Sequence, residues 1–190
     1  KVLVRLKRGD SPAQTLRQAP LNTNYLIALA RYGDKPYVAA GSTVEGRVYV
    51  YEDPMATLTR EDKPLLVPAQ IMRVEGGSYM TFSPNARFVL LENGSNIAVY
   101  DAETEKYYAY QTKALFDAPQ THVTWMDGFR LSLISNGKLT VFDFDGANQH
   151  TLAPASPNYL PFFDRQYRFS YNLTSGNMLT STPLLVSQDL

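Results

Sequence analysis

The sequence predicts an all-β protein, a β-propeller-like array of about four four-stranded antiparallel blades, either complete or part of a larger propeller. Short apolar segments rich in Val, Ile, Tyr and Phe alternate with turn signals that contain Gly, Asn or Asp, which is typical of strands. Sustained helical periodicity is nearly missing. A sequence pattern also recurs about every 40 residues, and four-stranded units of that length are typical of propeller blades.

The repeat becomes visible when three segments are aligned on an arginine. The copies are residues 87–101 (RFVLLENGSNIAVYD), 130–143 (RLSLISNGKLTVFD) and 168–180 (RFSYNLTSGNMLT). Each has Arg87, Arg130 or Arg168 after a turn, then a strand, a turn with Gly, and a second strand. We therefore expect the three arginines to occupy equivalent places in successive sheets.

These repeats predict one propeller-like domain over residues 1–190. The expected blades are approximately residues 22–68, 78–116, 122–154 and 158–190. Residues 1–21 are expected to form an N-terminal strand, either from a preceding blade or closing onto the chain end, and a short helix. The helix has Asp10-Ser11 as its N-cap and Pro12 at its first position, with Ala13, Leu16 and Ala19 on one face before Pro20. A second, weaker helix is expected over Thr112 to Asp117.

The strand composition predicts that the sheets stack face to face. The segments RFVLLE, IAVYD and LTVFDF keep bulky apolar residues at adjacent positions, so both faces of each strand need cover. Burying one such side chain stabilises by roughly 1.5–3 kcal/mol. A blade separated from its neighbours is therefore expected to lose most of its stability.

The turn Asp143-Phe-Asp145-Gly146 has two interpretations. With Asn148 it faintly resembles a calcium loop, but an EF-hand needs Gly at position six and Glu at position twelve, where this chain has Asn148 and Pro154. The Asp-Gly pair is typical of a tight hairpin turn with positive φ. We predict a hairpin and assign no metal.

The segment containing this turn, NGKLTVFDFDGANQHTL, resembles the repeat of TolB-type, WD40-like bacterial propellers. Residues 82–110, FSPNARFVLLENGSNIAVYDAETEKYYAY, are similar to the same repeat. The Gly-His and Trp-Asp pairs of eukaryotic WD40 repeats are lacking. The resemblance implies an extracytoplasmic protein, periplasmic or at the cell surface, with envelope or surface proteins as partners and an anchor ahead of the chain in some relatives.

Composition excludes several functions. The formal net charge is zero, so no basic field attracts nucleic acid. Cysteine is absent, which excludes disulfides and thiolate chemistry. No apolar run approaches the roughly 18 residues of a membrane-spanning helix. The chain begins at Lys1 rather than Met, which we interpret as a trimmed or processed terminus.

Candidate catalytic and ligand-binding groups are scattered. His122 and His150 lack the close spacing of a metal pair and are expected at the surface or between blades, although sequence order alone leaves a Ser-His-Asp triad open. Ser95 and Ser135 lie beside glycine turns without a G-x-S-x-G motif. Trp125 is expected in the core between blades; the alternative is a stacking platform for a ligand.

The remaining candidates are surface features. They are the carboxylates Glu61, Asp62, Glu103 and Glu105, the basic residues Lys1, Arg5, Lys7 and Arg8, and the glycosylation patterns Asn93-Gly-Ser95 and Asn172-Leu-Thr174. We expect the carboxylates in solvated loops and the basic residues along a strand edge, where positive charge discourages edge pairing. Contact with anionic polymers or lipid headgroups is the alternative for the basic residues.

We predict a non-enzymatic protein-interaction or scaffold module, because propellers carry rigid loops suited to binding and no catalytic constellation is present. No catalytic, cofactor-binding or metal residue is assigned, no cofactor is expected, and the binding residues are unknown. A protein partner is expected, and self-association stays open. The alternative is an enzyme-associated propeller that gates a peptidase domain or binds and cleaves glycan near its axis.

Overall fold

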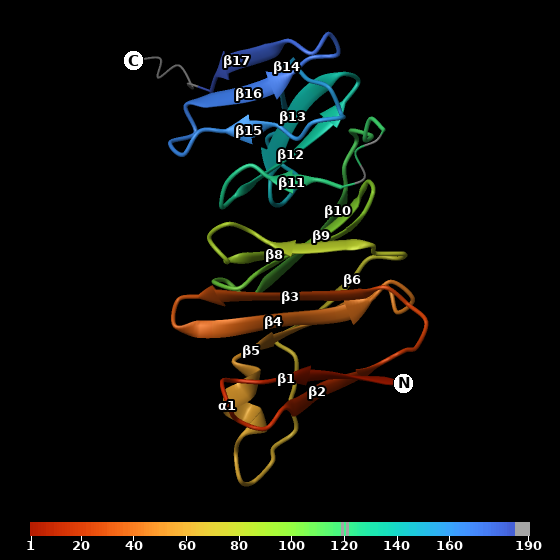
Figure 1. Cartoon of the computed structure of the whole chain (residues 1–190), viewed down its shortest axis with the longest axis vertical. Coiled ribbons are helices and arrows are strands. Elements are labelled where there is room, and N and C mark those ends of the chain that lie inside the picture. Colours follow the sequence, from red (N-terminus) through yellow and green to blue (C-terminus); the bar gives the residue numbers. More distant parts are fainter. Residues whose placement is uncertain (119, 121, 185–190) are drawn as a thin grey trace. The chain divides into compact units, whose positions relative to one another are not determined.

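The computed structural model describes residues 1–118, 120 and 122–184. It confirms the predicted fold class, since nearly every regular element is a strand and the strands form antiparallel sheets of two, three or four strands. Sequence neighbours pair in order, as in a meander (Figure 1). The chain divides into two compact units, Lys1–Ala109 and Tyr110–Leu190, which are described separately. That residues 1–190 form one domain with the proposed blade limits stays a prediction.

The first unit contains a two-stranded ribbon and two four-stranded sheets. Its elements are β1 (Val2–Leu6), β2 (Gln14–Ala19), β3 (Tyr25–Tyr32), β4 (Lys35–Ser42), β5 (Arg47–Glu52), α1 (Pro54–Leu58), β6 (Gln70–Arg73), β7 (Tyr79–Phe82), β8 (Phe88–Asn93), β9 (Asn96–Asp101) and β10 (Lys106–Gln111). The order is β1-β2, then β3-β4-β5-β6, then β10-β9-β8-β7.

The two four-stranded sheets of this unit pack face to face. Val48, Val50 and Met72 of one sheet cluster with Leu91 and Tyr100 of the other, and each is buried. The five residues from Phe88 to Glu92 are all buried, and so are those from Ile97 to Asp101. The adjacent bulky residues in the sequence therefore correspond to strands covered on both faces, as predicted.

The predicted helix over residues 12–19 is wrong, because Gln14–Ala19 is strand β2. Its partners in β1 shift by one residue between Val4 and Arg5, which leaves Leu16 as the extra residue of a β-bulge. The bulge places Leu16 and Ala19 on the same buried side three residues apart. This spacing imitates the helical period.

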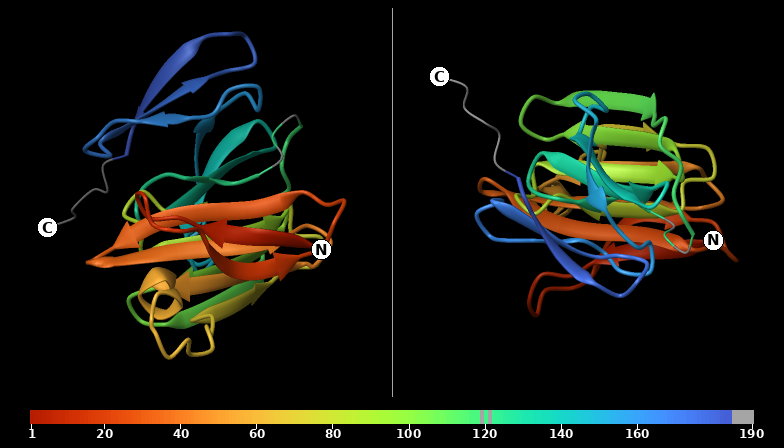
Figure 2. Two further views of the ribbon diagram at one scale, coloured as in Figure 1. Left: turned by 60° about the horizontal axis from the view of Figure 1, so that its bottom comes forward. Right: turned by 90° about the horizontal axis from the view of Figure 1, so that it is seen from above.

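The β1–β2 ribbon covers the face of the β3–β6 sheet opposite to the β7–β10 sheet. Leu16 packs with Val38, Ala40 and Tyr51, and Val4 lies against the same cluster. Figures 1 and 2 show the ribbon lying along the sheet that contains β3 and β4.

The second unit contains a four-stranded sheet and a three-stranded sheet. The strands are β11 (Thr124–Trp125), β12 (Arg130–Ser135), β13 (Lys138–Asp143), β14 (His150–Pro154), β15 (Phe162–Phe163), β16 (Phe169–Leu173) and β17 (Leu179–Pro183). The orders are β11-β12-β13-β14 and β15-β16-β17. Ile134, Leu139 and Ala155 form a small core against which Leu152 and Phe163 pack.

The three repeat arginines lie in equivalent places, at the start of the second strand of each sheet. Arg130 is the first residue of β12, and Arg87 and Arg168 immediately precede β8 and β16. Each forms an ion pair with a nearby aspartate: Arg87 with Asp101, Arg130 with Asp127, and Arg168 with Asp164.

The turn that begins at Asp143 is a hairpin connection, as predicted. The amide of Gly146 donates to the Asp143 carbonyl at 2.9 Å, and Gly146 has φ +85°. The Asn148 side chain donates to Oδ2 of Asp143 at 2.6 Å. The polar groups of the turn therefore form hydrogen bonds with one another.

Candidate functional site

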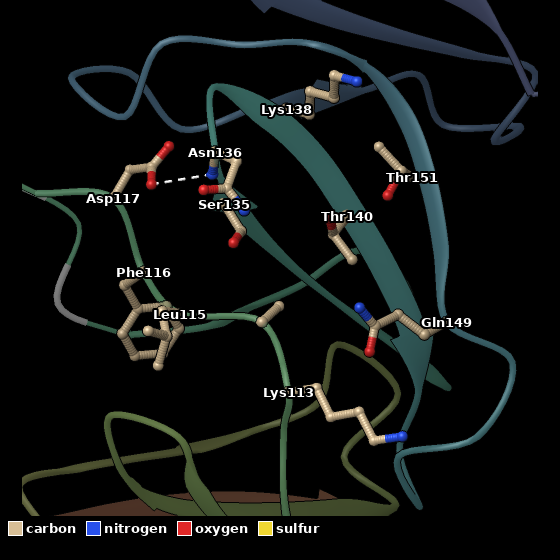
Figure 3. Close-up of a pocket in the computed structure, with 11 residues that line it drawn as sticks. Lys113, Leu115, Phe116, Asp117, Ser135, Asn136, Lys138, Thr140, Gln149 and Thr151 are labelled. Atoms are coloured by element: carbon tan, nitrogen blue, oxygen red, sulfur yellow. Dashed lines mark hydrogen bonds between the residues drawn. The ribbon is translucent and has the colours of Figure 1, made fainter.

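A concavity of about 790 Å³ lies in the second unit, against the sheet β11–β14 (Figure 3). Three parts of the chain form it: the connection that precedes β11, the β12–β13 hairpin, and the start of β14. Its lining residues are Lys113, Ala114, Leu115, Phe116, Asp117, Ser135, Asn136, Lys138, Thr140, Gln149 and Thr151. The sheet supplies a floor of small hydroxyl side chains, and the connection supplies one wall.

The wall segment, residues 112–117, is not the helix that the sequence predicts. The Asp117 amide donates to the Ile134 carbonyl at 3.0 Å, and the Asp117 carboxylate accepts the amides of Asn136 at 2.9 Å and Gly137 at 2.5 Å. These bonds fix the segment to β12 and to the β12–β13 turn, and this tertiary pairing overrides a weak local preference for helix.

Two polar side chains hold the wall in place. Besides the Asp117 contacts, Oε1 of Gln120 accepts the Ile134 amide at 2.7 Å, and Nε2 of Gln120 donates to the His122 carbonyl at 2.9 Å. Oδ1 and Oδ2 of Asp117 are thus each committed to a backbone amide. Asp117 is suited to positioning the wall and not to removing a proton from a substrate.

The surface of the concavity combines cations with an apolar edge. Lys113 and Lys138 are exposed, and Figure 3 shows them at opposite ends of the concavity. Leu115 is 70% exposed on the wall. Thr140 and Ser135 are buried in the floor. This combination suits a partner that brings carboxylates or other acceptors to the lysines and an apolar side chain to Leu115.

The two histidines lie at different places in the second unit. His150 is exposed at the start of β14, opposite Val141. His122 is half-buried ahead of β11, and burial lowers its pKa below the ordinary value. Across residues 1–118, 120 and 122–184, the structure contains no cluster of three or more His, Asp or Glu side chains that could hold a metal ion.

Ser95 belongs to the first unit, whereas Ser135 and Trp125 belong to the second. Ser95 lies in the turn between β8 and β9. Ser135 ends β12, is buried, and faces the concavity described above. Trp125 is half-buried on the edge strand β11, opposite Leu131.

The sequence-predicted carboxylates are exposed, and two of them, Asp62 and Glu103, form ion pairs with arginines. Asp62 accepts two hydrogen bonds from Arg60 at 2.9 and 2.7 Å in the loop after α1. Glu103 pairs with Arg87, and Glu105 has positive φ in the turn before β10. None of the four lines the concavity.

The glycosylation patterns differ in accessibility. Asn172 is 2% exposed in β16, so a glycan on its side chain is incompatible with the folded sheet. Asn93 is exposed, but its Nδ2 donates to the Glu75 carbonyl at 3.0 Å.

Sequence reasoning missed the concavity because its residues come from separate segments without a motif. The one local signal was the Asn136-Gly137 turn, whose amides need acceptors, together with an aspartate in the preceding connection. A carboxylate that accepts two turn amides has no fixed spacing from them in sequence.

In the part of the chain that the structure describes, no helix is long and apolar enough to span a membrane.

Comparison with known proteins gives only distant similarity to solved structures, with TM-scores below 0.5. No family model matches the chain, and no curated protein matches it. The chain is similar to a solved protein from Lactobacillus plantarum, with 16% identity, TM-score 0.44, 94% of this chain and 62% of that chain covered. It is similar to the dihydro-heme d1 dehydrogenase NirN, with 17% identity, TM-score 0.47, and 90% and 39% covered.

The chain is also similar to TolB from Acinetobacter baumannii, with 17% identity, TM-score 0.29, and 90% and 57% covered. The chain spans less than two thirds of the length of each of these structures.

Proposed function

We propose that the chain is a non-enzymatic protein-interaction module and that the concavity of the second unit binds a partner protein. The observation that carries this proposal is the wall of residues 112–117, which Asp117 ties to the sheet by three backbone contacts. A preformed wall loses little conformational entropy when a partner binds. The exposed Leu115 and the two lysines at the ends then provide apolar and electrostatic contacts.

Two features support binding over catalysis at this place. Among the residues that the structure describes, Asp117 is the only carboxylate in the lining and is occupied by backbone amides, and neither histidine lies in the lining. Lys113 and Lys138 are exposed, so neither has the buried environment that activates a lysine nucleophile.

Site-specific photocrosslinking tests the proposal. The photoreactive amino acid benzoylphenylalanine at Leu115 is expected to crosslink a defined partner in cells of the source organism. The same group at Leu65, which is 86% exposed in the first unit, is the matched control. Equal crosslinking at both positions, or none at Leu115, contradicts the proposal.

Affinity measurements with the identified partner provide the quantitative test. Lys113→Glu with Lys138→Glu reverses both charges of the concavity and is expected to weaken binding at least about tenfold, or about 1.4 kcal/mol. The control Lys63→Glu with Lys106→Glu makes the same change of net charge in the first unit. If both double variants weaken binding equally, the effect is global charge and the concavity is not the site.

We also propose an extracytoplasmic location in the cell envelope. The support is the resemblance of residues 82–110 and of the segment around Asp143 to TolB-type repeats. Cell fractionation of the source organism tests this: the protein is expected in the periplasmic or surface fraction, and recovery with cytoplasmic markers contradicts it.

A further inference from the structure

Strand β1 has one backbone edge without a strand partner among the described residues. It pairs with β2 alone, in a two-stranded sheet. A groove of about 390 Å³ runs beside it and is lined by residues 2–7 together with Tyr25, Ile27 and Leu29 of β3. We call this the β1–β3 groove. An open strand edge offers N–H and C=O groups to an added strand.

The two faces of β3 are covered unequally. Leu26 and Tyr32 pack on the core between the two four-stranded sheets. On the other face, Tyr25 is 40%, Ile27 51% and Leu29 66% exposed. These three alternate residues form an apolar strip.

The exposed strip lies next to a covered one. Ile27 is paired with Ala40 and Leu29 with Val38 across β3 and β4. Val38 and Ala40 are buried beneath the β1–β2 ribbon, whereas their β3 partners are not. The ribbon is therefore wide enough to cover β4 but leaves β3 bare, and one further strand beside β1 would lie over the strip, since neighbouring strands are about 4.8 Å apart.

The ribbon is held in place without this extra strand. Nη1 and Nη2 of Arg17 donate to the Glu45 carboxylate at 3.0 and 2.5 Å, and Ser42 donates to the same carboxylate at 2.8 Å. Arg17 also lies over the Tyr49 ring, 4.1 Å from its centroid. These contacts from β2 to the β4–β5 hairpin fix the groove before any ligand arrives.

Charge around the groove favours an acidic occupant. Arg5 and Lys7 line it, Arg8 follows, and within the described residues none of the three is in an ion pair. A second hollow adjoins the groove at Leu6, Lys7 and Leu29, and its acidic residues are Asp34 and Asp53. Oδ1 of Asp34 lies 3.8 Å from Nη2 of Arg31, which lines the same hollow. A second copy of β1 would bring like charges together, which disfavours self-pairing.

We propose that the β1–β3 groove binds an extended segment of a partner protein, which adds a strand to β1. Alternate apolar residues of the segment contact Ile27 and Leu29, and acidic residues face Arg5, Lys7 and Arg8. The inference rests on the proposed function of protein binding, but it uses a surface separate from the concavity. Backbone pairing provides affinity in this mode, and the alternate side chains provide specificity.

A synthetic peptide tests this directly. The probe is a fluorescein-labelled peptide of about nine residues with alternating valine and glutamate, long enough to span β1. The same peptide with lysine in place of glutamate is the control. Fluorescence anisotropy with the full chain is expected to show binding of the glutamate peptide and at least about tenfold weaker binding of the lysine peptide. Equal affinity for both peptides, or no binding of either, overturns the proposal.

Variants locate the binding. Ile27→Ser with Leu29→Ser is expected to weaken glutamate-peptide binding about tenfold or more, since two apolar contacts are lost. Leu65→Ser with Val67→Ser removes exposed apolar residues from the loop after α1 and is expected to leave binding unchanged. Equal losses from both pairs contradict the assignment. Amide exchange adds an independent readout, because the peptide should slow exchange in β1 of the unaltered protein, and no slowing refutes strand addition.

Two further arms separate the alternatives. Sedimentation of the chain alone is expected to show a monomer. A dimer that dissociates in the variant Ile27→Ser with Leu29→Ser would identify a second copy as the occupant and overturn the proposal. The concavity variant Lys113→Glu with Lys138→Glu is expected to keep peptide binding. If this variant keeps peptide binding and the photoreactive group at Leu115 captures no partner, the proposed role of the concavity is refuted and that of the β1–β3 groove is supported.

Discussion

Replacement of Asp101 by Asn removes the charge of a carboxylate whose side chain is 1% exposed at the end of β9. Its oxygens accept hydrogen bonds from Nε and Nη2 of Arg87 at 2.8 and 2.6 Å, from the Glu103 amide at 2.9 Å and from Oγ1 of Thr104 at 2.8 Å. Asparagine has one acceptor oxygen, so its amide group would face donors. The substitution therefore removes the negative charge that faces the largely buried Arg87 guanidinium, together with at least one of its hydrogen bonds.

The expected loss follows from these contacts. Hydrogen bonds to charged groups contribute about 1.5–3 kcal/mol each, and breaking a buried ion pair costs about 3–5 kcal/mol. Arg87 keeps its second partner, Glu103, which is half exposed and therefore screened. We expect Asp101→Asn to lower the free energy of unfolding by about 2–4 kcal/mol.

Urea denaturation followed by circular dichroism measures this loss. With a slope of about 2 kcal/mol per molar urea, the midpoint of the transition that includes the first unit should fall by about 1–2 M. Asp143→Asn is the matched control, because Asp143 also ends a third strand but is half-buried and pairs with Asn148. Its expected cost is below about 1 kcal/mol. Equal costs for the two substitutions would refute the reasoning.

The effect of Asp101 also has a pH signature. Burial alone would raise the pKa of Asp101, but hydrogen bonds from Arg87 and Thr104 outweigh it and hold the pKa below the ordinary value of 3.8. A lowered folded-state pKa gives stability that is present above pH 3.8 and is lost as the pH falls through the folded-state value. The difference between the native chain and Asp101→Asn should shrink in that acidic range, and a constant difference contradicts the assignment.

Three further substitutions test other parts of the fold. Gly146→Ala places a Cβ 2.7 Å from the Tyr110 ring at φ +85° and is expected to cost about 2 kcal/mol or more, whereas Gly176→Ala meets nothing within 4 Å; similar urea midpoints for the two would contradict this. Leu91→Ala, in the core of the first unit, is expected to cost about 2–5 kcal/mol, and a loss below about 1 kcal/mol would show that the sheets do not pack there. Burial raises the pKa of Tyr100 from 10.0 to about 12, so the stability that its neutral phenol provides is present below pH 10 and is lost as the pH rises through about 12. In a titration followed by phenolate absorbance, Tyr100→Phe should lack one tyrosine that ionises near pH 12, and an unchanged titration curve contradicts this.

The fold could be predicted largely because its sheets carry local signals. Apolar runs such as Phe88–Asn93 and Asn96–Asp101 are joined by a two-residue turn, and the Asp-Gly pair at Asp145 marks a hairpin. The repeat arginines could be aligned because each follows a turn that is fixed by its own backbone contacts. These features depend on residues close together in sequence.

The errors have equally specific causes. The bulge at Leu16 changed a strand's period of two into a spacing of three, which resembles a helix. The connection around Asp117 does not form the expected helix, because its hydrogen-bond partners lie in β12 and the following turn. The helix α1 was missed because five residues, Pro54–Leu58, are too few to establish a helical period.

The candidate sites could not be predicted from sequence, because each depends on tertiary contacts. The concavity needs Asp117 to meet the Asn136-Gly137 turn, and the β1–β3 groove needs a ribbon that covers β4 and not β3. The sequence did identify the basic residues beside β1 as a strand edge. It gave no sign that an apolar strip on β3 lies next to that edge.

The amide exchange rates of Asn136 and Gly137 test most directly whether the concavity is preformed. We predict that both amides exchange far more slowly than that of Gly94 in the β8–β9 turn, and that Asp117→Ala brings all three to similar rates. Fast exchange at Asn136 and Gly137 in the unaltered chain would mean that the wall is not fixed to the sheet, and would contradict the proposed binding surface.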